Sequence, residues 1–213
     1  MDDPPTGRPL GLRERKKAQT RRTIQEHALR LFLTQGYETT TVGQIARAAG
    51  VSHMTFFRYF PVKEAVVDTD DYDPLIARLI TERPPEEDPL TALHRALTHG
   101  LTAVYATDRD ALLTRTRLIL TTPALRARLW DNQYATERLF AEALAARLDG
   151  EVTLTLRVLA AAALAALTTA LATWVDGDGA ENLPDLADRA FLALRGAQDE
   201  EGPAFTGPAP ETQ

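Results

Sequence analysis

The sequence predicts an all-α protein: a small N-terminal helix-turn-helix domain followed by a larger helical bundle, with about nine helices in total. Three observations lead to this prediction. The long segments repeat their apolar residues with the 3.6-residue helical period, two short helices near residue 50 are joined by a tight turn, and an uncharged alanine-rich run covers residues 158–175. With 213 residues, 44% of them hydrophobic, the chain is long enough to bury a sizeable core.

The first helix is predicted from Ile24, Ala28, Leu31 and Phe32, which share one helical face, and it ends at Gly36. A second, short helix begins at Val42. Thr41 and Gln44 form a capping box ahead of it, and it stops at Gly50.

The third helix begins after Ser52, its predicted N-cap residue. Phe56 and Phe60 lie one turn apart on the side that we expect to pack against the first helix. The segment AAGVS joins the second and third helices, as in a helix-turn-helix unit whose second helix enters the major groove. The side chains expected to point outward are His53, Met54, Thr55, Phe57, Arg58 and Tyr59.

A fourth helix is predicted to begin near Lys63 and to be interrupted at Asp73 and Pro74. Five more are expected near residues 90–106, 109–121, 123–148, 151–175 and 184–196. The predicted domains are a DNA-binding domain at 12–62 and a ligand-binding and dimerisation domain at 63–197, with disordered tails at 1–11 and 198–213.

Charge is distributed unevenly along the chain. The formal net charge is -6, yet from Arg8 to Lys63 there are 11 Lys and Arg against 3 Asp and Glu, a net charge of +8. The N-terminal part of the chain is basic and the remainder is acidic. This distribution suggests a polyanionic partner for the N-terminal part alone. Within it, we expect some of the run RERKKAQTRR to contact phosphates; the alternative is a solvated helix face.

The uncharged run at residues 158–175 would form a helix roughly 27 Å long. We expect a buried bundle helix rather than a membrane span, because alanines and threonines make up much of it and no basic cluster flanks it. The N-terminus has no apolar segment typical of a secretory signal. A cytoplasmic protein with no membrane partner is therefore predicted.

The stretch TTVGQIARAAGVSHMTFFRYFPVKEAV resembles the DNA-binding signature of TetR-family transcriptional regulators, and the match extends over residues 15–67 without a gap. The resemblance implies that His53, Met54, Thr55 and Phe57 face bases and that Thr41, Tyr59 and Lys63 meet phosphates. Ser52 and Arg58 complete the predicted DNA-binding set. Their chemistry fits these roles, since hydroxyls and imidazole reach base edges and apolar side chains contact thymine methyl groups.

Three positions depart from the family pattern. Val62 stands where a Ser or Thr usually caps the fourth helix, Gly43 removes a side chain that some members use on DNA, and Arg58 replaces a commoner aromatic residue. The operator sequence of a relative therefore does not transfer to this chain.

DDYDPLI at 70–76 and RLILTTPALRARLWDNQ at 117–133 look similar to a branch of the family that includes mycofactocin-type regulators, whose C-terminal domain has been linked to acyl-CoA-like ligands. The candidate effector-binding residues are Tyr105, Arg117, Trp130, Tyr134 and Trp174. The alternatives are core packing for the aromatic residues, and an internal salt bridge or an exposed head group for Arg117.

No cofactor or metal site is predicted: His94 and His99 lie about 140° apart around a helix. Nor does the chain contain a nucleophile elbow or a phosphate-binding glycine loop, so no enzyme is expected. Two leucine-rich stripes on the last two helices predict a four-helix homodimer interface. They consist of Leu164, Leu167, Leu171 and Trp174, and of Leu183, Leu186, Ala190, Phe191 and Leu194.

Together these features predict a homodimeric repressor that binds a near-palindromic double-stranded operator and is released by a small hydrophobic or acyl-CoA-like effector. Two alternatives stay open at this point. One is an architectural DNA-binding protein without ligand control, and the other is an enzyme or lipid-binding module that retains a helix-turn-helix by ancestry.

Overall fold

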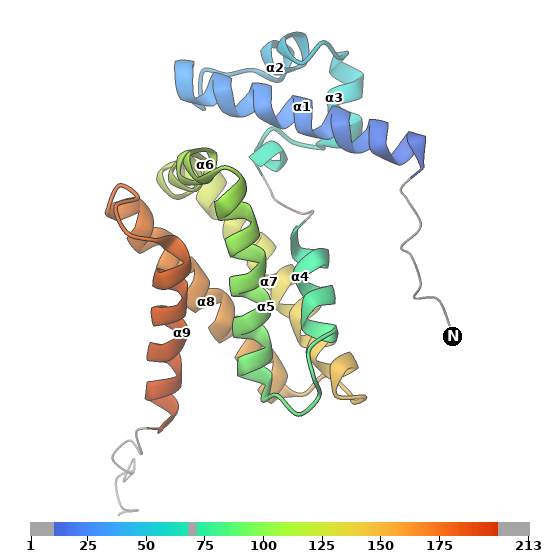
Figure 1. Cartoon of the computed structure of the whole chain (residues 1–213). Helices are drawn as coiled ribbons and strands as arrows, with labels where there is room; N and C mark the ends of the chain where they lie inside the picture. Colours follow the sequence, from blue (N-terminus) through green and yellow to red (C-terminus); the bar gives the residue numbers. More distant parts are fainter. Residues whose placement is uncertain (1–10, 68–71, 200–213) are drawn as a thin grey trace, which may run out of the picture. The chain divides into compact units, whose positions relative to one another are not determined.

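The computed structural model describes residues 11–67 and 72–199, and in these ranges all regular structure is helical, with nine α-helices and one 3-10 turn. The side chains of residues 130, 131 and 197–199 are not described. The chain divides into two compact units, and each is considered by itself (Figure 1). The all-α fold class is confirmed.

The first unit contains α1 (Leu12–Gln35), α2 (Val42–Ala48), α3 (His53–Tyr59) and the 3-10 turn η1 (Glu64–Val67). Residues 121–128 also group with this unit. Its core is apolar and aromatic, because the helices bury the faces that their spacing predicts. The fully buried side chains include Ile24, Ala28, Ile45, Phe56 and Phe60.

The second unit begins with α4 (Tyr72–Thr81) and α5 (Pro89–Thr107), and apart from residues 121–128 it includes α6 (Arg109–Thr121) and α7 (Pro123–Arg147). It ends with α8 (Leu154–Asp176) and α9 (Leu183–Asp199). The last five helices begin and end within three residues of the predicted positions. The predicted tails fall almost wholly outside the described residues, although α9 continues to Asp199.

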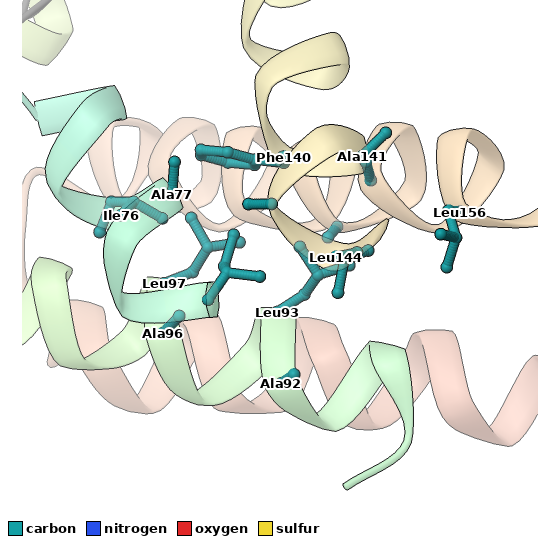
Figure 2. Close-up of a cluster of buried hydrophobic side chains, with 14 of the residues drawn as sticks. Ile76, Ala77, Ala92, Leu93, Ala96, Leu97, Phe140, Ala141, Leu144 and Leu156 are labelled. Carbon is teal, nitrogen blue, oxygen red and sulfur yellow. The ribbon is translucent and has the colours of Figure 1, made fainter. Parts of the chain in front are cut away.

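A buried apolar cluster holds the second unit together (Figure 2). Ile76 and Ala77 of α4 face Leu93 and Leu97 of α5, and Phe140 of α7 closes the cluster from another side. Each fully buried large side chain of this kind contributes about 1.5–3 kcal/mol to folding. The core of the second unit is thus built between α4, α5, α7, α8 and α9.

α4 approaches α5 closely at Gly100. A Cβ atom at this position would lie 2.2 Å from Cδ1 of Ile76, so a larger residue would displace the isoleucine. A side chain at position 100 would therefore require the end of the Ile76 side chain to move.

α7 also holds α4 and the turn that follows it. The Thr136 hydroxyl donates to Oδ2 of Asp73 at 2.6 Å, near the start of α4. At the other end, Nη1 of Arg147 donates to the carbonyl oxygens of Pro84 and Glu87 at 2.6 and 2.9 Å. Arg147 is 7% exposed, so its guanidinium is a buried support for the α4–α5 turn.

The prediction that Asp73 and Pro74 interrupt the fourth helix is wrong. Asp73 and Pro74 lie in the first turn of α4 instead. Proline is tolerated there because the amide groups of the first turn have no partner within the helix. The region near Lys63 forms the separate turn η1, whose buried residues Ala65 and Val66 belong to the first unit.

Of the nine residues in the predicted dimerisation stripes, five are buried within a single chain, while Leu167, Leu171, Ala190 and Leu194 are half-buried and their place in an interface remains a prediction. Leu164, Trp174, Leu183, Leu186 and Phe191 are at most 9% exposed within a single chain, where α8 and α9 pack on each other and on α5. Side chains buried in this way do not form a subunit interface. The large exposed apolar residues of these two helices are Leu154, Val158 and Leu192.

α8 is long and apolar enough to cross a membrane by length and composition, with a mean hydropathy of 1.9 over its most apolar window. Core helices of soluble proteins pass the same test. Leu156, Ala160, Ala163, Ala170 and Trp174 of α8 are buried against neighbouring helices, while 22% of the apolar window as a whole is buried in the single chain.

Candidate nucleic-acid interface

α2 and its flanking turns have the predicted local chemistry. The Thr41 hydroxyl accepts a hydrogen bond from the Gln44 amide at 3.2 Å, and Gln44 Oε1 accepts one from the Thr41 amide at 2.7 Å. This reciprocal pair is the predicted capping box. At the other end Gly50 has φ +66°, and the Val51 amide donates to the Ala46 carbonyl at 2.9 Å, which closes the helix in a Schellman arrangement.

α3 begins at the predicted cap. The Ser52 hydroxyl accepts from the Thr55 amide at 3.0 Å and lies 2.9 Å from the Thr55 hydroxyl. The two hydroxyls thus orient each other at the N-terminal end of the helix, where a reading helix meets base edges. Ser52 is exposed and Thr55 is half-buried.

Two phenylalanines anchor α3. Phe56 and Phe60 are fully buried, and their ring centroids are 5.7 Å apart. Arg21 of α1 supports the end of α3, because its guanidinium lies 4.6 Å from the Phe60 ring centroid and Nη1 donates to the Tyr59 carbonyl at 3.4 Å. Arg21 and Tyr59 are 38 positions apart in the chain, so no local sequence pattern predicts this role of Arg21.

The opposite face of α3 is exposed. Met54 is 83% exposed and Phe57 is 42% exposed, and His53 and Arg58 are also exposed. His53 and Phe57 are one turn apart, and their rings meet edge to face at 4.9 Å, so Phe57 orients the imidazole. Four of the predicted contact residues therefore form one continuous surface.

Tyr59 and Thr41 lie at the margins of this surface. Tyr59 is half-buried beneath the Arg58 guanidinium, which lies 5.6 Å from its ring centroid. The Thr41 side chain is exposed while it caps α2.

Lys63 has local partners that its sequence position did not reveal. Its ammonium donates to the carbonyl oxygens of Tyr37 and Thr40 at 3.0 and 3.2 Å, and lies 3.9 Å from the Tyr37 ring centroid. Lys63 thus fastens the loop between α1 and α2 to the segment after α3. A phosphate contact by Lys63 remains a prediction, and the ammonium would make it in addition to these bonds.

Glu64 forms the second half of this junction by accepting a hydrogen bond from the Tyr37 hydroxyl. Burial opposes ionisation of Glu64, but this hydrogen bond, its own backbone amide and the charges of Lys63 and Arg128 outweigh burial and lower the pKa of Glu64. Burial, reinforced by Glu64, raises the pKa of Tyr37 above its usual value.

The four candidate effector residues whose side chains the structure describes do not form one cluster in the second unit. Tyr105 and Trp174 are neighbours, with ring centroids 5.8 Å apart, and Trp174 is 1% exposed. Arg117 forms a salt bridge with Asp178, and the pair lies at the surface, with the two side chains 42% and 88% exposed. Tyr134 is 58% exposed, and the side chain of Trp130 lies outside the described part of the chain.

Arg109 joins the aromatic pair, which the sequence analysis missed. Its guanidinium donates to the Tyr105 hydroxyl at 3.2 Å and to the Gly179 carbonyl, and lies 5.7 Å from the Trp174 ring centroid. The spacing of four residues between Tyr105 and Arg109 was the available signal.

Two hollows lie on the surface of the second unit. The larger, of about 770 Å³, is bordered by α4, α5 and α9, with His94, His99 and Asp188 among its lining residues. The smaller, of about 230 Å³, includes Tyr134 and Glu137. His94 stacks on Phe191 and bonds to Asp188 at 2.7 Å, so its ring is committed to the α5–α9 contact.

The geometry of the first unit defines a helix-turn-helix protein whose second helix presents an exposed, partly basic face. Family comparisons agree with this class. Residues 24–69 match the family model described as bacterial regulatory proteins, tetR family, and residues 87–198 match the model of the MftR C-terminal domain. The chain therefore belongs to the TetR family of transcriptional regulators, with a C-terminal domain of the MftR type.

Two relatives are named as regulators. The HTH-type transcriptional regulator TcmR of Streptomyces glaucescens is 38% identical over 144 residues, which cover 64% of this chain and 64% of TcmR, just under two thirds of its length. MftR of Mycobacterium tuberculosis, named for the transcriptional regulation of mycofactocin biosynthesis, is 30% identical over 142 residues, covering 65% of this chain and 71% of MftR.

Solved structures share the fold. FadR of Bacillus subtilis, determined in complex with stearoyl-CoA, matches with a TM-score of 0.58 and 20% identity over 81% of this chain and 96% of that one. FadR of Thermus thermophilus, determined with lauroyl-CoA, matches with a TM-score of 0.50 and 22% identity over 91% and 99%. At these identities the likeness concerns the fold alone.

Proposed function

We propose that this chain is a ligand-responsive transcriptional regulator that represses its target by binding a near-palindromic operator as a homodimer. The observation that carries the proposal is the exposed face of α3, formed by His53, Met54, Phe57 and Arg58 on a helix anchored from behind by Phe56 and Phe60. Such a face combines hydrogen-bonding, apolar and cationic groups, which suits base edges, thymine methyl groups and phosphates in a major groove.

The DNA-binding residues are assigned by role. His53, Met54, Thr55 and Phe57 read bases, and Ser52 holds Thr55 in place as the cap of α3. The phosphate contacts come from Thr41, Arg58, Tyr59 and Lys63. The net charge of +8 between Arg8 and Lys63 supports the approach of this part of the chain to DNA.

The homodimer forms through the outer faces of α8 and α9. Leu154 and Val158, 78% and 56% exposed, begin a stripe on α8, and Leu192 of α9 is 61% exposed. Burying these side chains against a second copy would remove apolar surface from water. A two-fold axis then places two reading helices roughly 34–36 Å apart, one turn of DNA, or somewhat further.

The effector is a small hydrophobic or acyl-CoA-like molecule. Support comes from the MftR-type domain match and from the acyl-CoA complexes of two proteins that share the fold. The described candidates are Tyr105 of α5, Arg117 of α6 and Trp174 of α8, and Tyr134 lies by the smaller hollow. Trp130 completes the candidate set.

An effector acts only if it binds the DNA-incompetent arrangement more tightly than the competent one. α4 is the element through which we expect this preference to act, because it directly follows the DNA-binding unit in the chain. α4 is bonded to Thr136 through Asp73, and the turn after α4 is bonded to Arg147 through Pro84. We expect these two contacts to form or break together when α4 moves.

Footprinting tests the proposal on the DNA upstream of the gene that encodes the chain, with and without a panel of acyl-CoAs. We expect a protected near-palindrome that is lost as one of the ligands is added. A defined footprint that no ligand alters would overturn the effector, and salt-sensitive binding without a defined footprint would indicate an architectural protein instead. A protein that acts in this way would be cytoplasmic.

A further inference from the structure

The first helix is longer than the core of its unit requires. α1 spans Leu12–Gln35, yet its first buried residue is Ile24. Every side chain from Leu12 to Gln19 is exposed, so about 12 Å of helix continues beyond the packed core. We call residues 12–20 the basic arm (Figure 1).

The arm is helical because it extends an anchored helix. Adding turns to an existing helix avoids the cost of nucleation, which would leave an isolated helix of this length marginal in water. Its side chains gain little from packing, since Leu12 is 77% exposed. The arm's composition therefore points to a surface that is used for something other than the core.

Two of the basic residues of the arm lie on one face of α1. Nearer the C-terminal end of α1, the same face packs against the core. Arg13 and Lys17 lie within about 20° of Ile24 around the helix axis. The stripe that begins with Arg13, Lys17 and Arg21 continues into the buried Ile24 and Ala28. The same face is thus apolar over the core and basic beyond it.

Arg21 fixes the arm relative to the reading helix. It contacts both Phe60 and the carbonyl of Tyr59, the last residue of α3. In Figure 1, the N-terminal end of α1 extends beyond α3. Since α3 turns its buried side to α1, the Arg13 and Lys17 face of the arm looks in the same direction as the exposed face of α3.

We propose that the basic arm is a second DNA contact, in which Arg13 and Lys17 bind backbone phosphates of double-stranded DNA flanking the bases that α3 reads. The partner follows from charge: residues 12–22 carry six Lys and Arg against one Glu. Phosphate contacts of this kind widen the footprint and add salt dependence without adding base preference. The inference rests on the proposed function and specifies how far its DNA contact extends.

The test compares two double variants of the full chain that change charge equally. R13Q/K17Q neutralises the face that we assign to DNA. R15Q/R22Q neutralises two exposed positions about 160–180° from Ile24 around the same helix. Circular dichroism checks that both remain helical.

Operator affinity is then measured against salt concentration for the three proteins. We expect R13Q/K17Q to lower the slope of log K against log salt by about 3.6 for the operator-bound dimer, at about 0.9 for each of four phosphate contacts, two from each subunit, and to shorten the outer edges of the footprint. R15Q/R22Q should leave the slope and the footprint near the wild-type values. The two double variants should prefer the same bases as the wild type.

Three outcomes overturn the inference. Equal slope changes in both variants would indicate unspecific attraction, and unchanged slopes would show that the arm does not touch DNA. In these two cases the wild-type footprint still stands, so the proposed function survives. If the wild-type chain protects no DNA and instead binds vesicles of anionic lipid through the basic arm, the proposed function and this inference fail together.

Discussion

The hydroxyl group of Tyr37 donates a hydrogen bond to the carboxylate of Glu64 and joins the loop after α1 to the turn after α3. Lys63 reinforces the junction from the neighbouring position by binding two carbonyl oxygens of the same loop. The position of the reading helix thus depends on residues that do not belong to its exposed face.

Replacing Tyr37 with phenylalanine should lower the stability of the first unit by about 1–2 kcal/mol, because it removes a hydrogen bond to a charged, partly buried carboxylate. The pKa of Glu64 is lowered in the folded protein. Its contribution is therefore present above its unfolded value and is lost as pH falls through the lowered folded value. Urea melts from pH 7 to pH 3 should show a smaller acid loss for Y37F than for the wild type, and equal losses would contradict this coupling.

Lys63→Met should both destabilise the first unit, by about 1 kcal/mol, and weaken binding to all DNA sequences alike. The methionine keeps an apolar stem over Tyr37 but cannot donate to the two loop carbonyls. Thermal unfolding and binding to specific and unrelated duplexes separate the two effects. A variant with full stability and altered base preference would show that Lys63 has neither role.

Ser52→Ala should cost about 1 kcal/mol of stability by removing the cap of α3. Thr55→Ala keeps this cap and should instead relax base preference, with a change of about 1–3 kcal/mol between specific and mismatched sites. Unfolding curves and competition binding on single-base variants of the operator distinguish them. A loss of stability in Thr55→Ala with unchanged base preference would show that Thr55 has a structural role.

Gly100→Ala should destabilise the second unit by about 1–3 kcal/mol, because the new methyl group meets Cδ1 of Ile76. In the I76V background, which lacks that atom, the same substitution should cost less or become stabilising, since alanine favours a helix by about 1 kcal/mol over glycine. A double-mutant cycle by chemical unfolding measures the coupling. Additive effects would show that the alanine methyl group does not clash with Cδ1 of Ile76.

Sequence patterns predicted the local features well and the long-range ones poorly. The capping box at Thr41, the turn at Gly50 and the anchors Phe56 and Phe60 depend on residues close in sequence, so spacing sufficed. The carbonyl contacts of Lys63 join residues more than 20 positions apart, and the buried contacts of Arg147 join residues about 60 apart, so no periodicity revealed them.

Five residues of the dimerisation stripes were assigned to the wrong contact for a different reason. α8 is apolar or small on most of its circumference, so its periodicity does not tell a face that packs within the chain from one that meets a second copy. The structure separates them, since Leu164 and Trp174 are buried and Leu154 and Val158 are exposed. We expect L154E/V158E to give monomers in analytical ultracentrifugation while α-helical content is retained, and persistent dimers would contradict the revised face.

Selection from random double-stranded DNA tests the reading role of α3 most directly. The wild-type chain should enrich one motif with two half-sites related by a dyad, their centres roughly 34–36 Å or somewhat further apart. An H53A/F57A variant with unchanged unfolding should lose that motif while it keeps weak, salt-sensitive binding. A wild-type pool with no shared motif, or the same motif enriched by both proteins, would contradict α3 as the element that reads DNA.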